Sequence, residues 1–202
     1  MSGKKYELTD TTITVDGHIL HRIRALRDFG DVKIGDLGGY VETDFNLSHG
    51  GRCWIYDSGV VYGDARVLDD ASVSNGARVY DRARICDYAR IYGKAEVRGD
   101  ANVRGFGQVY GHAQVYGAAR IFHFAQIYDD AQVFDDASVS DGARVYGRAM
   151  VYNYARIHGV ARTYGDACVF ETAQVYGDSH ILSSAQIRGN SLVCGRSKTE
   201  DY

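Results

Sequence analysis

The sequence predicts an all-β fold in which one chain winds as a triangular solenoid of parallel strands, and three regularities indicate it. From about residue 53 to residue 195, Val or Ile recurs every six residues, with Thr163 as the exception. A small residue, nearly always Ala, stands two positions before each of them. Gly, Asp or Asn stands two positions after it in 21 of the 24 hexads. These regularities predict the architecture in detail and leave the function open.

Each hexad has room for one short strand and one corner. We number positions from the Val or Ile, which is position 0. Because side chains alternate along a strand, positions −2 and 0 face the interior and position −1 faces water. Position +2 falls at the corner, where Gly, Asp and Asn tolerate a positive φ. Three hexads close one coil, which predicts about eight 18-residue coils and, at roughly 4.8 Å per coil, a prism about 38 Å long.

Residues 1–52 do not follow the six-residue register and predict a small β cap. Short strands are expected at 6–8, 12–15, 18–24, 32–34 and 40–42, with a tight hairpin at Asp16-Gly17. Such a cap would cover the apolar end and the unpaired strand edges of the first coil. The chain is therefore divided into a cap (1–52), a β-helix (53–196) and a short polar C-terminal tail (197–202).

Composition and charge narrow the classes of function. The formal net charge is −3 with both signs dispersed, which gives no electrostatic case for binding nucleic acid or a membrane surface. The polar N-terminus has no signal-peptide pattern, and no apolar run is long enough to span a bilayer. The four cysteines lack paired or metal-type spacing, so free thiols and a cytoplasmic location are expected. They are Cys53, Cys86, Cys168 and Cys194.

Two stretches carry a family resemblance. Hexads such as Val61-Tyr62-Gly63-Asp64-Ala65-Arg66 resemble the hexapeptide-repeat superfamily of left-handed parallel β-helices. Left-handedness is implied by this resemblance alone, because general crossover rules favour the opposite hand. The segment from Arg24 to Asp57 resembles the entry region of the uncharacterised YdcK-like acetyltransferases of enterobacteria. The resemblance implies a bacterial or phage protein and, for an enzyme, an acyltransferase that uses acetyl-CoA.

A longer internal repeat is superimposed on the hexads. Residues 69–93 and 135–159 agree at 18 of 25 positions. The offset between the two copies is eleven hexads but not a whole number of coils, so the copy is expected on a different face of the prism. We interpret it as the expansion of a structural unit, because a copied ligand site would not stay aligned with its neighbours.

Aromatic side chains gather at position +1, where Tyr occurs in 11 of the 24 hexads. Reading every third hexad gives an outward column of rings about 4.8 Å apart. Such a column can stiffen the coil by stacking, contact another subunit, or bind a sugar or a base. Its members are Tyr92, Tyr110, Tyr128, Tyr146 and Tyr164, with Tyr56 two coils earlier.

Arginine recurs at the outward strand position. One face carries Arg84, Arg120 and Arg156, and another carries Arg90, Arg144 and Arg162. Arginine beside Tyr can hold a phosphate, which suggests capture of a small phosphorylated or aromatic ligand. The favoured interpretation is pairing with corner aspartates on a solvated surface. Examples of such aspartates are Asp87, Asp129 and Asp141.

Histidines are the candidates for a catalytic base. The resemblance implies a His that acts as general base near a cleft between subunits, with the acyl-CoA laid along the coils. The candidates are His112, His123, His158 and His180. They occupy different hexad positions and so share no row, which favours a plain surface role. The spacing gives no three-histidine zinc site, and no metal is predicted.

These observations favour a non-catalytic β-helical binding or scaffold protein that acts through its outer faces. We expect a homo-oligomer, with a small molecule or saccharide as a possible ligand and no cofactor. The alternative is an acetyl-CoA-dependent transferase with its site between subunits. The unbroken hexads count against that alternative, because the transferases of this superfamily typically have loops extruded from the coils and a C-terminal helix.

Overall fold

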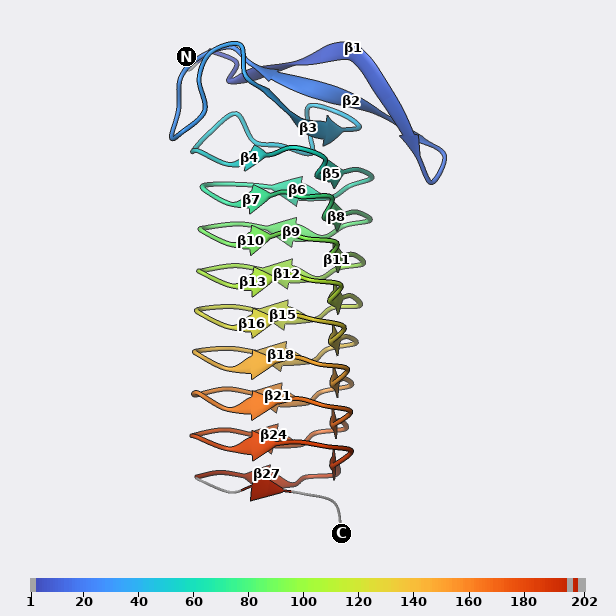
Figure 1. Cartoon of the computed structure of the whole chain (residues 1–202), viewed down its shortest axis with the longest axis vertical. Coiled ribbons are helices and arrows are strands. Elements are labelled where there is room, and N and C mark those ends of the chain that lie inside the picture. The colour runs from blue at the N-terminus through green and yellow to red at the C-terminus, as the bar shows by residue number, and fades with distance from the viewer. Residues whose placement is uncertain (1–2, 196–197, 200–202) are drawn as a thin grey trace.

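The computed structural model describes residues 3–195 and 198–199 and confirms an all-β solenoid (Figure 1). In these residues no helix is long and apolar enough to cross a membrane. Strands β4 to β28 have two residues each and lie in three parallel sheets. Each strand pairs with the equivalent strand of the next coil, as Val97 does with Val115. The coil makes about nine turns, and the left hand stays a prediction.

The three sheets form the sides of the coil and are named here by their first strand in the chain. The β1 sheet contains β1 (Tyr6–Val15), β2 (His18–Ala25), β3 (Leu37–Val41), β5 (Val60–Val61), β8 (Arg78–Val79), β11 (Glu96–Val97), β14 (Gln114–Val115), β17 (Gln132–Val133), β20 (Met150–Val151), β23 (Cys168–Val169) and β26 (Gln186–Ile187). The β4 sheet contains β4 (Trp54–Ile55), β7 (Ser72–Val73), β10 (Arg90–Ile91), β13 (Gln108–Val109), β16 (Gln126–Ile127), β19 (Arg144–Val145), β22 (Arg162–Thr163), β25 (His180–Ile181) and β28 (Lys198–Thr199). The β6 sheet contains β6 (Arg66–Val67), β9 (Arg84–Ile85), β12 (Asn102–Val103), β15 (Arg120–Ile121), β18 (Ser138–Val139), β21 (Arg156–Ile157), β24 (Gln174–Val175) and β27 (Leu192–Val193).

The interior is filled by the side chains at positions −2 and 0. Nearly all of the Ala, Val and Ile residues at these positions are fully buried. Two polar side chains share this interior. The Ser179 hydroxyl donates to the Tyr176 carbonyl oxygen at 2.6 Å, whereas the buried Thr163 hydroxyl has no hydrogen-bond partner among the described residues. Since the interior is packed throughout, any ligand site of the coil lies on its outside.

The backbone conformation at the corners explains why Gly and Asp predominate at position +2. Every residue at this position, from Asp57 to Gly195, has a positive φ, including His123 at 55° and Glu171 at 59°. At the Asp corners from Asp69 to Asp141, the carboxylate also accepts the backbone N–H of the corner one coil further on. Asp87 accepts from Gly105 at 2.9 Å, for example. Asp therefore satisfies the corner conformation and ties consecutive coils together.

The cap is a hairpin followed by one further strand. β1 and β2 pair antiparallel around Asp16 and Gly17, which have φ values of 49° and 85°. β1 runs through the two strands expected at 6–8 and 12–15, with an irregularity between Leu8 and Thr12. The strand expected at 32–34 is wrong, because Val32 forms only an isolated bridge with Phe29 in a local turn.

β3 joins the cap to the coil. It pairs antiparallel with β2 and parallel with β5, so the cap continues the β1 sheet over the first coil (Figure 1). The approach is close, since a Cβ on Gly39 would lie 2.4 Å from the Gly59 carbonyl oxygen. Trp54 is buried at this end against Phe29 and Tyr6. The cap therefore covers the apolar end of the first coil.

A buried lysine fixes the N-terminal end of the cap. The Lys5 ammonium donates to the Cys53 carbonyl oxygen at 2.7 Å and lies 3.2 Å from the Cys53 sulfur. Burial lowers the pKa of Lys5 and raises the pKa of the Cys53 thiol. None of the four cysteines forms a disulfide in the described residues.

The C-terminal tail differs from the prediction where it can be compared. Lys198–Thr199 forms β28 and pairs with β25, which continues the β4 sheet by one rung. β28 adds one third of a coil to the eight predicted, and β3 and the parallel bridge of Leu47 with Val67 add two rungs at the cap end. Residues 197 and 200–202 of the predicted tail lie outside the described residues.

Candidate functional site

The tyrosines predicted to form one column do stack in space. In this column, called the Tyr92 column, neighbouring ring centroids lie 4.7–4.9 Å apart. The rings are half-buried, and burial raises the pKa of Tyr110 to about 12. Tyr92 donates its hydroxyl to Gln108 at 3.1 Å. Stacking along the coil therefore holds these rings in place. The column comprises Tyr92, Tyr110, Tyr128, Tyr146 and Tyr164.

Tyr56 is separated from this column by one coil. Ser74 occupies the intervening position, and the Tyr56 hydroxyl donates instead to Asp31 of the cap at 2.7 Å. Burial, followed by that hydrogen bond, raises the pKa of Tyr56. Tyr56 thus connects the cap to the first coil.

A second aromatic column lies along the β1 sheet. Tyr116, Phe134, Tyr152 and Phe170 stack at 4.8–5.0 Å, and Arg98 covers Tyr116 with its guanidinium 4.4 Å from the ring centroid. The recurrence of Tyr alone does not reveal this column, because Tyr and Phe alternate here. Counting any aromatic ring at position +1 would have found it.

A third column is the most exposed. Tyr88, Phe106 and Phe124 occupy position +3 at the corner between the β6 and β4 sheets, and their rings stack at 4.9 and 5.1 Å. Their exposed fractions are 48%, 48% and 62%. Together with Arg90, Gln108 and Gln126 they line an open hollow of about 240 Å³. This set is called the Tyr88 column, and it presents apolar rings to solvent beside amide groups.

The arginine rows do not pair as expected. No ion pair joins Arg84, Arg120 or Arg156 to a carboxylate in the described part of the chain, and the same holds for Arg90, Arg144 and Arg162. The corner aspartates accept backbone N–H groups instead, as Asp129 does from Gly147 at 3.2 Å. Arginines at position +3 pair one coil on, for example Arg148 with Asp166 at 2.7 Å. The predicted pairing was wrong because the corner carboxylate points along the axis.

The histidine candidates lie apart from one another. His112 is exposed, and His158 stacks on Tyr176 at 5.1 Å. His123 differs from both, because its Nδ1 lies 2.9 Å from Oδ1 of Asp141 on the next coil. The pKa of Asp141 is lowered, first by the N–H of Gly159 and then by His123. Of these three histidines, His123 is the one that a carboxylate orients.

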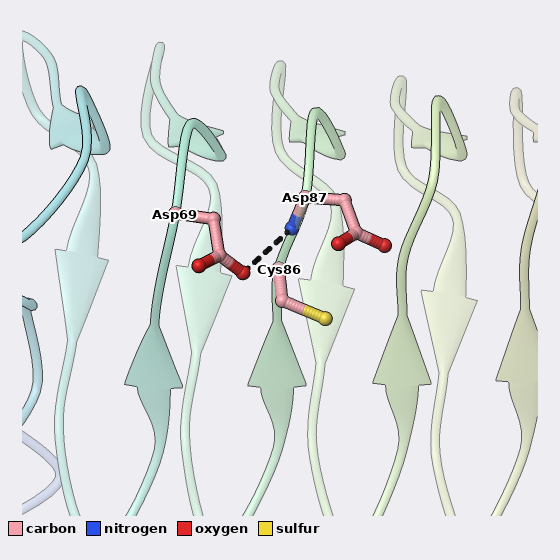
Figure 2. Close-up of side chains that lie close together, drawn as sticks. All are labelled: Asp69, Cys86 and Asp87. Atoms are coloured by element: carbon pink, nitrogen blue, oxygen red, sulfur yellow. Dashed lines mark hydrogen bonds between the residues drawn. The ribbon is translucent and has the colours of Figure 1, made fainter.

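One cluster combines residues of the types that bind metals. Asp69, Cys86 and Asp87 place a ligand atom each within 4.8 Å of one another (Figure 2). The Asp69 carboxylate accepts the Asp87 N–H at 3.2 Å, so this contact belongs to the corner ladder. Burial, assisted by the neighbouring carboxylates, raises the pKa of the Cys86 thiol, which disfavours the thiolate that metals prefer. The ladder accounts for this cluster without an ion.

The comparisons with known proteins agree with this geometry. Residues 143–159 match the family described as the YdcK beta solenoid repeat. A stretch of 43 residues is 40% identical to the "Uncharacterized acetyltransferase YdcK" of Escherichia coli strain K12. The chain resembles YdcK. That match covers 21% of this chain and 13% of the length of YdcK, so this chain spans only a small part of that protein's length.

Proposed function

We propose that this protein is a β-helical binding or scaffold protein that assembles with a second copy of itself through the Tyr88 column. The supporting observation is the exposure of three stacked rings at one corner, with Phe124 exposed by 62%. Contiguous exposed apolar surface on a folded protein marks an interaction site. The outer faces, and not the packed interior, are then where the protein works.

A second copy suits this surface because of its repeat distance. The rings of the Tyr88 column recur at 4.9 and 5.1 Å along the coil. Another copy of the chain has the same rise, so a contact made on one coil is repeated on the next. A globular partner has no such period and would engage one or two rings. Gln108 and Gln126, beside the rings, supply amide groups that can donate and accept across such an interface.

The test is the molar mass in solution of the Phe106→Ser/Phe124→Ser variant, measured by light scattering after size exclusion. We expect the wild type to be a dimer or larger and the variant to lose mass at equal concentration. Tyr154→Ser is the matched control, because Tyr154 is an equally exposed aromatic residue, at 63%, outside the column. A monomeric wild type, or a variant that keeps the wild-type mass, would show that the column is not the interface.

A specific observation favours a second function, acyl transfer from acetyl-CoA. Asp141 can hold the His123 ring with Nδ1 toward the carboxylate, which leaves Nε2 free to accept a proton. YdcK, which this chain resembles over 43 residues, is called an acetyltransferase. In this proposal His123 is the general base and Asp141 orients it.

Acetyl-CoA binding and turnover distinguish the two functions. We expect acetyl-CoA to raise the melting temperature of the wild type and His123→Ala to abolish acetylation of an amine or hydroxyl acceptor panel. His112→Ala is the matched control and should retain activity. An unchanged melting temperature at millimolar acetyl-CoA, with no turnover, would contradict the transferase proposal and leave the scaffold proposal standing.

A further inference from the structure

Two hollows open on the outer surface where both outward side chains of a strand are small. One lies over Ser138 and Ser140 and has a volume of about 380 Å³. The other lies over Ser72 and Ser74, beneath the cap, and has a volume of about 860 Å³. In every other hexad of residues 53–195, at least one of positions −1 and +1 carries a larger side chain. The hollows therefore result from the two Ser-Val-Ser segments.

The two hollows are copies of one another. Seven residues that line the Ser138 hollow stand eleven hexads after residues that line the Ser72 hollow. This offset is the same as that of the internal repeat. The matching residues include some from the coils on either side of the two repeat copies. The pairs are Tyr56 and Phe122, Asp70 and Asp136, Ser72 and Ser138, Ser74 and Ser140, Arg90 and Arg156, Tyr92 and His158, and Gln108 and Gln174.

This correspondence revises the interpretation of the repeat as plain structural expansion. The copy does lie on a different face, since Ser72 is in the β4 sheet and Ser138 is in the β6 sheet. Apart from Gly30 and Asp31 of the cap, each hollow is nevertheless lined along a single face, by rows that are one coil apart. A duplication of whole hexads therefore carries such a lining with it, whichever face it reaches.

The charge of the copy differs from that of the original. The Ser72 hollow holds Asp31, Asp57 and Asp70 against Arg52 and Arg90. The Ser138 hollow holds one carboxylate, Asp136, against the guanidinium groups of Arg104, Arg120 and Arg156. None of these three arginines forms an ion pair with a carboxylate in residues 3–195. The Ser138 hollow is thus a site of net positive charge.

The floor of the hollow offers an unused hydroxyl. Ser140 is 9% exposed, and its hydroxyl makes no hydrogen bond to the described residues. Ser138 lies between Arg120 and Arg156, its strand neighbours on either side. Those two arginines stand two coils apart, about 10 Å along the axis, which leaves space for a tetrahedral anion between them. Guanidinium groups and hydroxyls are the donors that proteins use to hold phosphate.

We propose that the Ser138 hollow binds a phosphate monoester, with its phosphoryl group above Ser138 between Arg120 and Arg156. The Ser140 hydroxyl donates to the ester side of the group, and the organic portion lies along the rings of Phe122 and His158. The Ser72 hollow, with its three carboxylates, does not bind this ligand.

The test uses the full chain, titrated by calorimetry with inorganic phosphate and with phenyl phosphate at constant ionic strength. We expect one site per chain, with phenyl phosphate bound more tightly than inorganic phosphate. Ser140→Tyr should abolish binding by filling the hollow, because a Tyr there continues the column between Phe122 and His158. For the same reason this variant should melt no lower than the wild type. The matched control, Ser74→Tyr, fills the other hollow and should leave binding unchanged.

An independent variant tests the charge. Arg120→Gln/Arg156→Gln alters two exposed side chains and should weaken phenyl phosphate binding tenfold or more, since each lost charged hydrogen bond accounts for roughly a factor of ten. Absence of binding to the wild type, binding that survives in Ser140→Tyr, or equal loss in Ser74→Tyr would each overturn the proposal.

Discussion

Thr163 is the one polar residue at position 0 of the 24 hexads, and its hydroxyl is buried without a hydrogen-bond partner in the described chain. We expect Thr163→Val to raise the free energy of unfolding by about 1–3 kcal/mol, because it removes the unsatisfied hydroxyl and keeps the branched shape. Chemical denaturation measures this change. Val109→Thr, at the same position of the same sheet three coils earlier, is the reverse control and should destabilise the protein by a similar amount. A Thr163→Val variant that is less stable than the wild type would mean that the hydroxyl has a partner in solution.

At this scale the sequence predicted backbone requirements better than side-chain partners. The positive φ at position +2 follows from the shape of a corner alone, so all of these residues conformed, including His123 and Glu171. The partners of Arg120 and Asp129 depend on which rows face one another and how far each side chain reaches. The structure supplied that information. Among the described residues, Asp129 bonds to a backbone N–H group and Arg120 forms no ion pair.

At the scale of an element, the aromatic columns act as continuous ladders that link successive coils. Tyr128 stacks on Tyr110 at 4.9 Å and on Tyr146 at 4.8 Å. We expect Tyr128→Ala to lower the free energy of unfolding by about 1–3 kcal/mol, since two ring pairs are lost at roughly 0.5–1.5 kcal/mol each. Tyr176 stacks on one ring, that of His158, so Tyr176→Ala should cost about half as much. Equal costs in the two variants would show that stacking does not set the effect.

The columns also show why a search for one recurring residue type finds less than a comparison of equivalent hexad positions. The Tyr92 column was predicted because identical residues recur, whereas the alternation of Tyr116, Phe134, Tyr152 and Phe170 hid a ladder of the same kind. The Ser138 hollow was missed for a related reason. Its defining feature is the smallness of Ser138 and Ser140 beside larger neighbours, and that contrast becomes visible only when the rows of three coils are aligned.

For the whole molecule, the three sheets are equivalent on the inside and different on the outside. Interior positions carry the same Ala and Val pattern on every face, so the packing does not distinguish one face from another. The outer rows, by contrast, carry an exposed aromatic column on one corner and a cluster of arginines on one face. Because the interior is the same on every face and only the outer rows differ, a duplication of eleven hexads can be accommodated. The fold requires a multiple of six residues, and the outer surface is then redistributed among the faces.

Deletions of defined length test whether interior packing determines the fold independently of the outer rows. Removing 99–116, one coil, or 99–104, one hexad, joins Arg98 to a glycine that already has a positive φ, Gly117 or Gly105. Both variants should unfold cooperatively, with melting temperatures within a few degrees of each other. Removing 99–102 instead places Val103 at the corner, where a β-branched residue is disfavoured, and turns downstream apolar residues outward. We expect this variant to lose the cooperative transition in circular dichroism. If the one-hexad deletion also fails, register between the outer rows, and not interior packing, determines the fold.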